Sequence, residues 1–212
     1  MAPLSKERRR LLERATLQYA EHLDEAAEWL EGRGIDLEVA RSSGLGVIRN
    51  PPPQHYHMEG RLSIPYLTDA GPVAIVGRCM LPHNCKEQVD HGKMAKPTGQ
   101  GNALYGVQSM SWADEWIVVT EGEIDTLTWH QIGVPAVSVP GAKNWKEHWP
   151  HVFADFSRVY IATDGDEAGE KLWDKLSYEL DNAIRMKMPD GEDTNSMYLK
   201  RGKDYLLSRI KK

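Results

Sequence analysis

The feature that most constrains the fold is a regular alternation of short apolar and longer amphipathic segments in the second half of the chain. Strands are predicted at Trp116–Thr120, Val134–Val139, Val159–Thr163 and Ala183–Met188. Helices are predicted between them, and the clearest has Ala168, Leu172, Leu176 and Leu180 four residues apart. Such alternation implies right-handed crossovers. Residues 111–212 are therefore expected to form an α/β domain with a mainly parallel sheet flanked by helices.

Acidic clusters follow three of these predicted strands, at residues 121–125, 164–169 and 190–193. Ligands collect beyond the carboxyl ends of parallel strands, so the clusters are expected at one edge of the sheet. Carboxylates crowded there repel one another unless a divalent cation lies between them. An acidic residue after a strand is also a common helix N-cap. Three clusters in register favour the metal interpretation.

Residues 1–110 have a different pattern, which predicts a smaller mixed α+β subdomain. Residues 6–32 read as a helix and 37–42 as a second, short one. A hairpin is predicted over 61–80, with its turn at 68–71. The polar segment 81–102 is predicted to be a long loop, and long loops in compact domains are more often functional than idle.

Charge and composition narrow the class of protein. The net charge is −5, and all of the excess acid lies in residues 111–212, which fits carboxylates gathered to bind cations. No apolar stretch is long enough to span a bilayer, and no signal-peptide core follows the basic N-terminus. Two cysteines exclude a disulfide scaffold and indicate the cytoplasm, or the host cytoplasm for a phage-encoded protein.

Two cysteines and two histidines fall near the start of the polar segment. Cys79, His83, Cys85 and His91 have a spacing that matches no common structural zinc module, in which CxxC-like pairs recur. Cys79 is interpreted instead as a small core residue at a strand end. Zinc is not expected on this reasoning.

The acidic segments 120–125 and 163–169 resemble the signature of the Toprim domain, a Glu-Gly…Asp segment and a later Asp-x-Asp, each after a strand. Further matches narrow the resemblance to the polymerase core of bacterial DnaG-type primases. They are Met188–Asp193 with Tyr198–Gly202, and, outside the Toprim part, Arg61–Pro65, Gly77-Arg78, Lys93 and Leu104–Gly106. The resemblance covers about residues 20–210.

The resemblance implies roles for individual residues. Glu121 would be the catalytic acid–base residue, and Asp164 and Asp166 would be catalytic metal ligands. Glu121, Asp125 and Asp193 would complete a site for Mg²⁺, with Mn²⁺ as a substitute. Nucleotide or template phosphate would be bound by Arg61, Arg78 and Lys93, with Lys96 as an alternative in the same loop.

The function implied is DNA-directed synthesis of short RNA primers, with single-stranded DNA and ribonucleoside triphosphates as partners and no membrane. Asn195 stands where primases commonly have another Asp. No zinc ribbon precedes the core, so a zinc-ribbon-bearing partner in trans or a replicative helicase is a further expected partner, as in a minimal phage-encoded version. A Toprim-type nuclease and a non-catalytic nucleotide- or nucleic-acid-binding protein are the alternatives.

Overall fold

The computed structural model describes residues 4–83, 85 and 91–210, and the chain forms two compact units that divide between Ala103 and Leu104. The sequence placed this boundary at residue 110. The difference arises because Tyr105 exchanges two backbone hydrogen bonds with Ser138, at 3.1 and 3.0 Å, in the second unit. Leu104 also belongs to the core of that unit.

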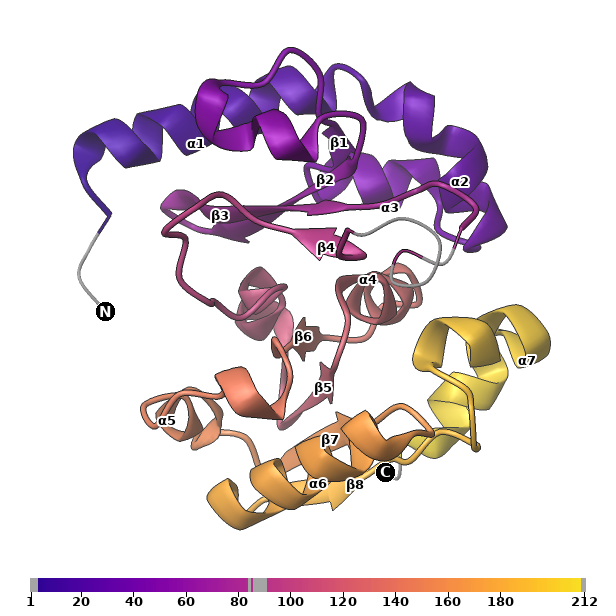
Figure 1. Ribbon diagram of the computed structural model, residues 1–212. Coiled ribbons are helices and arrows are strands. Elements are labelled where there is room, and N and C mark those ends of the chain that lie inside the picture. The colour runs from indigo at the N-terminus through magenta and orange to yellow at the C-terminus, as the bar shows by residue number, and fades with distance from the viewer. Residues whose placement is uncertain (1–3, 84, 86–90, 211–212) are drawn as a thin grey trace. The chain divides into compact units, whose positions relative to one another are not determined.

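The first unit is built on an antiparallel sheet in the order β1-β2-β3-β4 (Figure 1). Its strands are β1 (Gly46–Val47), β2 (Leu62–Thr68), β3 (Gly71–Arg78) and β4 (Met94–Ala95). The predicted hairpin is β2–β3, whose register runs from Leu62 opposite Arg78 to Thr68 opposite Gly71. At the open end of this hairpin, β4 pairs with the last two residues of β3.

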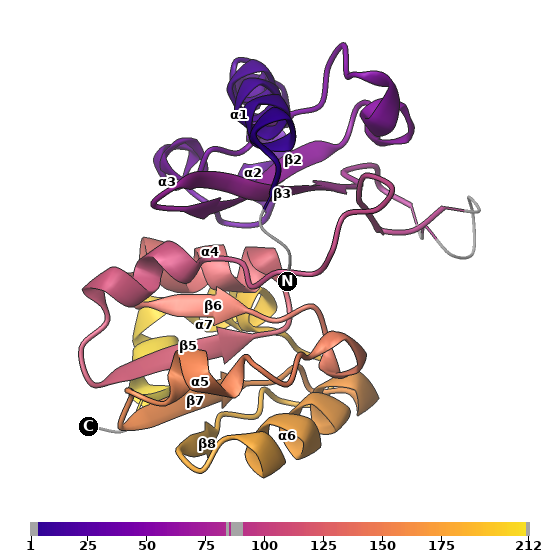
Figure 2. The ribbon, with the colours of Figure 1, turned by 90° about the vertical axis from the view of Figure 1, so that its left-hand side faces the viewer.

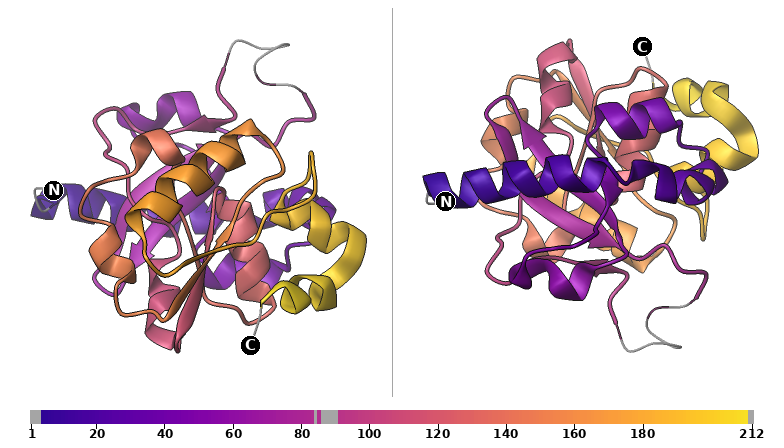
Figure 3. Two further views of the ribbon diagram at one scale, coloured as in Figure 1. Left: turned by 90° about the horizontal axis from the view of Figure 1, so that it is seen from below. Right: turned by 90° about the horizontal axis from the view of Figure 1, so that it is seen from above.

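Helix α1 (Lys6–Ala20) crosses this sheet, as the view from above shows (Figure 3). Its Leu12 and Tyr19 pack with Ile75 of β3. The predicted single helix over residues 6–32 is wrong, because the chain breaks after α1 into a 3-10 turn, Leu23–Ala26, and α2 (Ala27–Gly32). The break lets Leu23 and Ala26 become buried, and the turn contacts β1. Helix α3 (Leu37–Ser42) has the predicted bounds, and a second 3-10 turn covers Pro53–Met58.

The second unit contains the predicted parallel sheet, in the order β6-β5-β7-β8. The strands are β5 (Trp116–Thr120), β6 (Ala136–Ser138), β7 (Arg158–Ala162) and β8 (Ala183–Arg185). Strand β8 is shorter than predicted, although Met186 and Met188 still donate backbone hydrogen bonds to β7 and to Thr163 just after it, at 2.9 and 3.0 Å. The chain therefore follows β7 as far as the acidic segment that begins at Asp190.

Helices cover both faces of this sheet (Figure 2). One face packs on α5 (Pro150–Phe153) and α6 (Glu167–Glu179), the other on α4 (Glu123–Gln131) and α7 (Thr194–Arg209). The helix predicted between the second and third of these strands is only the short α5, because Pro150 is tolerated only in a first turn. Short 3-10 turns cover Val107–Trp112 and Ala142–Asn144.

Among the described residues, no helix is both long and apolar enough to cross a bilayer.

Candidate metal and nucleotide sites

The two central strands of the parallel sheet bring Glu121 and Asp164 together. Strands β5 and β7 are parallel neighbours, and Thr120 lies opposite Ala162 at their carboxyl ends. Glu121 follows β5 directly, and the backbone N–H of Asp164 donates to its Oε1 at 3.2 Å. Two acidic residues that are far apart in the sequence are thus in direct hydrogen-bond contact.

Backbone hydrogen bonds tie the third acidic segment to the second. Gly165 donates to the carbonyl of Glu192, and Gly191 donates to the carbonyl of Gly165, both at 2.8 Å. A Cβ on Gly165 would lie 1.8 Å from the carbonyl oxygen of Pro189. Because no side chain fits there, glycine is required for the two loops to approach this closely.

Asp125 reaches the site from α4, where it is 7% exposed. Its Oδ1 accepts a hydrogen bond of 2.9 Å from the backbone N–H of Asn195 at the start of α7. The Asn195 amide donates to Thr128 Oγ1, one turn further along α4, at 3.0 Å. Asn195 therefore fastens α7 to α4 and orients Asp125, a role that the sequence did not reveal.

The acidic side chains around Asp164 also interact electrostatically, and the pKa of Asp164 is raised from 3.8 to about 8. Burial is the largest cause. The negative charges of Asp125, Glu121, Asp193 and Asp166 follow, in that order. The structure therefore places all the predicted acidic side chains within electrostatic reach of Asp164.

Glu121 has a raised pKa as well. Burial is again the main cause, and the charge of Asp166 adds to it, while the hydrogen bond from the Asp164 N–H acts in the opposite direction. A carboxylate whose pKa is moved towards neutrality is a better proton acceptor for a reacting hydroxyl at physiological pH.

Asp166 and Asp193 also cap helices, so the simpler interpretation of these residues is partly right. Asp166 Oδ1 accepts from the N–H of Gly169 at 2.9 Å, and Asp193 Oδ1 accepts from the N–H of Ser196 at 2.6 Å. Each cap fixes the position of a carboxylate at the edge of the sheet. Capping and metal binding are compatible functions of the same side chain.

The donor set fits magnesium, which prefers a few carboxylate oxygens and keeps several of its water molecules. Burial and crowding raise the proton affinity of Asp164 in the absence of a cation, and a divalent ion would relieve the repulsion.

In the first unit, Arg78 and Lys93 line a cavity of about 320 Å³. Trp29 and Arg33 of the α2 region line it too, and no sequence motif predicts a role for either residue. Both guanidinium groups lie over the Trp29 ring, at 5.3 Å for Arg33 and 5.5 Å for Arg78. The only sequence signal was the four-residue spacing of Trp29 and Arg33 across a helix end.

Arg61 and Lys96 do not line this cavity. Arg61 donates to the backbone carbonyls of Gly92 and Lys93 at 2.9 and 3.3 Å. Lys96 donates to Asn102 Oδ1 at 2.8 Å. Of the predicted phosphate-binding residues, only Arg78 and Lys93 line this cavity. Arg61 instead binds the backbone next to Lys93, and Lys96 pairs with Asn102 outside the cavity.

The segment around the end of β3 contains a further cluster. One donor atom from each of Cys79, His83, Cys85 and His91 lies within 4.8 Å of the other three. The spacing of these residues in the sequence argues against a zinc site. The structure shows that the unusual spacing does not keep them apart.

The comparisons with known proteins agree with the arrangement of the second unit. A Toprim-like family model matches residues 118–198. The Gene 57 protein of Mycobacterium phage D29 is 39% identical over 125 residues, which cover 58% of this chain and 82% of that protein. The chain belongs to the Toprim-like family.

Primases are relatives of this Toprim-like chain at lower identity. A DNA primase of Pseudomonas putida is 25% identical over 226 residues, covering 87% of this chain, which spans about a third (34%) of that primase. The RNA polymerase domain of Mycobacterium tuberculosis primase DnaG superposes with a TM-score of 0.76 at 23% identity, covering 97% of this chain and 83% of that domain. The chain therefore has the fold of DnaG catalytic cores.

Proposed function

We propose that this Toprim-like protein is a DNA primase core that synthesises short RNA primers on single-stranded DNA by metal-dependent nucleotidyl transfer. The observation that carries the proposal is the convergence of carboxylates from three loops and α4 on Asp164. Primase relatives and the DnaG-like fold support nucleotide addition over the other reactions that a Toprim acidic site serves.

In this proposal Glu121 accepts the proton of the attacking 3′-hydroxyl. Its raised pKa suits that role, and the hydrogen bond from Asp164 N–H holds its carboxylate beside the metal ligands. Asp164 and Asp166 would hold Mg²⁺, with Asp125 and Asp193 completing the acidic environment. When bound, the ion supplies charge stabilisation for the attacking and leaving oxygens.

The first unit carries cations of its own that suit phosphate. Arg78 and Lys93, on one cavity, are proposed to bind the triphosphate or the template phosphate. Arg61 is proposed to act mainly by positioning the loop that carries Lys93, since its guanidinium holds that backbone. A replicative helicase or a zinc-ribbon-bearing protein in trans would be further partners, and the cytoplasm of the host cell the expected location.

The test is RNA synthesis on single-stranded DNA with labelled ribonucleotides and Mg²⁺ or Mn²⁺. The active-site variant is Asp164→Asn with Asp166→Asn, because asparagine keeps both the size and the N-cap at residue 166. Glu167→Gln is the matched control. Glu167 directly follows Asp166 as the first residue of α6, and it is highly exposed and paired with Lys171.

Short RNA made by the wild type and by Glu167→Gln, but not by the double variant, is the expected result. Cleaved DNA without synthesis would replace the proposal with a nuclease. Template or nucleotide binding that is unchanged in the double variant, with neither reaction, would replace it with a non-catalytic binding role.

A further inference from the structure

Two cysteines and two histidines that follow β3 lie close together: Cys79, His83, Cys85 and His91. Cys79 is the first residue after β3, and its N–H donates to the carbonyl of Lys93 at 2.9 Å, which extends the β3–β4 pairing by one more hydrogen bond. His91 lies two residues before Lys93, and its N–H points to the carbonyl of Cys85 at 3.4 Å. The ladder thus fixes both ends of the loop that carries the four side chains.

The donor atoms lie near the spacing of a tetrahedral site, and the two histidine nitrogens are slightly closer together than such a site requires. His83 Nε2 and His91 Nε2 are 3.0 Å apart, and Cys79 Sγ is 3.7 Å from His83 Nε2. In a tetrahedral zinc site with bonds of about 2.0–2.3 Å, neighbouring ligand atoms are separated by about 3.3–3.8 Å. The Cys85 thiol forms a hydrogen bond with Cys79, and neither cysteine is in a disulfide.

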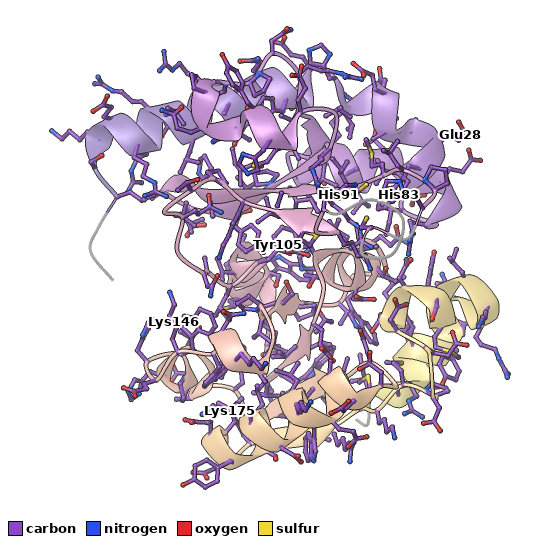
Figure 4. All side chains as sticks on the ribbon, viewed as in Figure 1. Glu28, His83, His91, Tyr105, Lys146 and Lys175 are labelled. Carbon is purple, nitrogen blue, oxygen red and sulfur yellow. The ribbon has the colours of Figure 1, made fainter. Side chains whose placement is uncertain are left out.

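One hydrogen bond behind the cluster is compatible with metal binding. His83 and His91 are near each other (Figure 4), with ring centroids 5.0 Å apart and their Nε2 atoms 3.0 Å apart. The opposite nitrogen of His91, Nδ1, lies 3.0 Å from the carbonyl of Gly92. Donation from Nδ1–H to that carbonyl leaves Nε2 as the unprotonated nitrogen, the arrangement found behind most metal-bound histidines.

Arg61 completes this outer layer. Its guanidinium donates to the carbonyls of Gly92 and Lys93. Its Nη2, which can only donate, lies 3.1 Å from His91 Nδ1, and this contact is a hydrogen bond only in the tautomer protonated at Nε2, so metal binding at Nε2 would give it up. The donations to the two carbonyls are retained whichever nitrogen of His91 carries the proton. The loop that presents His91 is therefore held on the side remote from the donor atoms.

A hydrogen bond between two histidines explains one of these contacts but not the set. It would not require both cysteines to converge on the same point. Two thiolates and two neutral imidazoles are a donor set that zinc takes in closed structural sites, and the two thiolate charges neutralise the ion. Magnesium, by contrast, prefers oxygen ligands.

We propose that Cys79, His83, Cys85 and His91 form a structural zinc site. Three of the four, Cys79, His83 and Cys85, lie on the wall of the 320 Å³ cavity that Arg78 and Lys93 also line. Zinc binding would fasten the loop after β3 and hold that wall in place. This inference concerns the first unit alone and stands whether or not the chain makes primers.

The direct test is the zinc content of the full chain, purified under reducing conditions without chelator and reconstituted with zinc sulfate. One equivalent of zinc per chain is expected, and it should be lost in Cys79→Ser/Cys85→Ser and in His83→Ala/His91→Ala. His151→Ala is the matched control, because His151 is exposed on α5 of the second unit. Absence of stoichiometric zinc in the reconstituted wild type, or the same zinc content in the cluster variants, would overturn the proposal.

A second measurement needs no variant to fold. Cobalt titrated into the metal-free wild-type protein should give the visible bands of a tetrahedral ion and a thiolate-to-cobalt charge-transfer band, both displaced by one equivalent of zinc. An octahedral spectrum without charge transfer would contradict the site. A Cys79–Cys85 disulfide that forms in glutathione buffer at cytoplasmic poise, even with zinc present, would assign the pair to redox chemistry instead.

Discussion

The two units of this chain gather opposite kinds of chemistry. The second unit assembles hard carboxylate oxygens from loops that follow successive parallel strands, and the resulting repulsion raises the pKa of Asp164 to about 8. The first unit assembles guanidinium groups over Trp29 and a cluster of sulfur and nitrogen donors. One unit is suited to a hydrated divalent cation, the other to phosphate and a soft structural ion.

The two sites depend on the backbone in different ways. The acidic site follows from the topology, since parallel strands deliver their carboxyl ends to one edge. The Cys/His cluster depends on one loop held by the β3–β4 ladder and by Arg61. Substitutions in the second unit should therefore act mainly on catalysis. Substitutions in the first unit should act on nucleotide or template affinity and on the rigidity of the loop after β3.

The largest effect is expected from Asp164→Asn. Loss of one charge from the metal site should lower the rate of primer synthesis by on the order of 10³-fold, because the transition state loses its main electrostatic support. Single-turnover rates at saturating nucleotide measure this. A reduction below tenfold would show that the catalytic centre lies elsewhere.

Arg78→Ala should have a smaller effect, and on affinity. The loss of one charge-assisted hydrogen bond to phosphate corresponds to about 10–100-fold weaker nucleotide or template binding. Fluorescence anisotropy with labelled DNA and nucleotide competition measures both. Lys96→Ala is the control, because Lys96 is paired with Asn102 away from the cavity. Equal losses of affinity in the two variants would show that the cavity is not the phosphate-binding site.

Gly165→Ala should separate the acidic loops without removing a charge. The new methyl group would meet the Pro189 carbonyl at 1.8 Å, and we expect a loss of about 1–3 kcal/mol in the free energy of unfolding, together with weaker Mg²⁺ binding. Urea titrations measure the first quantity. Gly32→Ala is the control, because a Cβ there meets nothing within 4 Å, and its stability should be unchanged. Unchanged stability in both variants would refute the close packing of the acidic loops.

The smallest effect is the pH dependence of stability without metal. Because the pKa of Asp164 is raised from 3.8 to about 8, the folded state between these values holds a proton that the unfolded state has lost. Stability should therefore fall as pH rises through this window, by on the order of 1 kcal/mol after allowance for solvent screening. Urea denaturation at several pH values between about 4 and 8 measures this decline in the free energy of unfolding. The Asp164→Asn variant should not show it. A decline of the same size in the variant would show that another group causes it.

Much of the second unit could be predicted from the sequence, because periodicity reports the strands and α6 directly. The edge at which Glu121, Asp164 and Asp193 meet followed from the parallel topology. The role of Asn195 did not follow, since its partners Asp125 and Thr128 come from another helix. Asp166 and Asp193 cap helices. The sequence pattern alone could not distinguish such capping from metal binding.

The first unit was harder to predict. Its central hairpin was marked by a turn sequence, but the break after α1 depends on the burial of Leu23 and Ala26, which local propensity does not record. Arg33 and Trp29 meet Arg78 through tertiary folding. The Cys/His cluster was rejected because its spacing fits no common module, and only the β3–β4 register shows that the loop closes.

The most direct test of the central claim is divalent-ion binding to the acidic site. Mn²⁺ binding, followed by electron paramagnetic resonance with Mg²⁺ as competitor, compares the wild type with Asp164→Asn and Glu167→Gln. We predict that Asp164→Asn weakens Mn²⁺ binding at least tenfold, whereas Glu167→Gln leaves it unchanged, and that binding in the wild type releases a proton below about pH 8. Equal Mn²⁺ affinity in the wild type and Asp164→Asn would contradict the account.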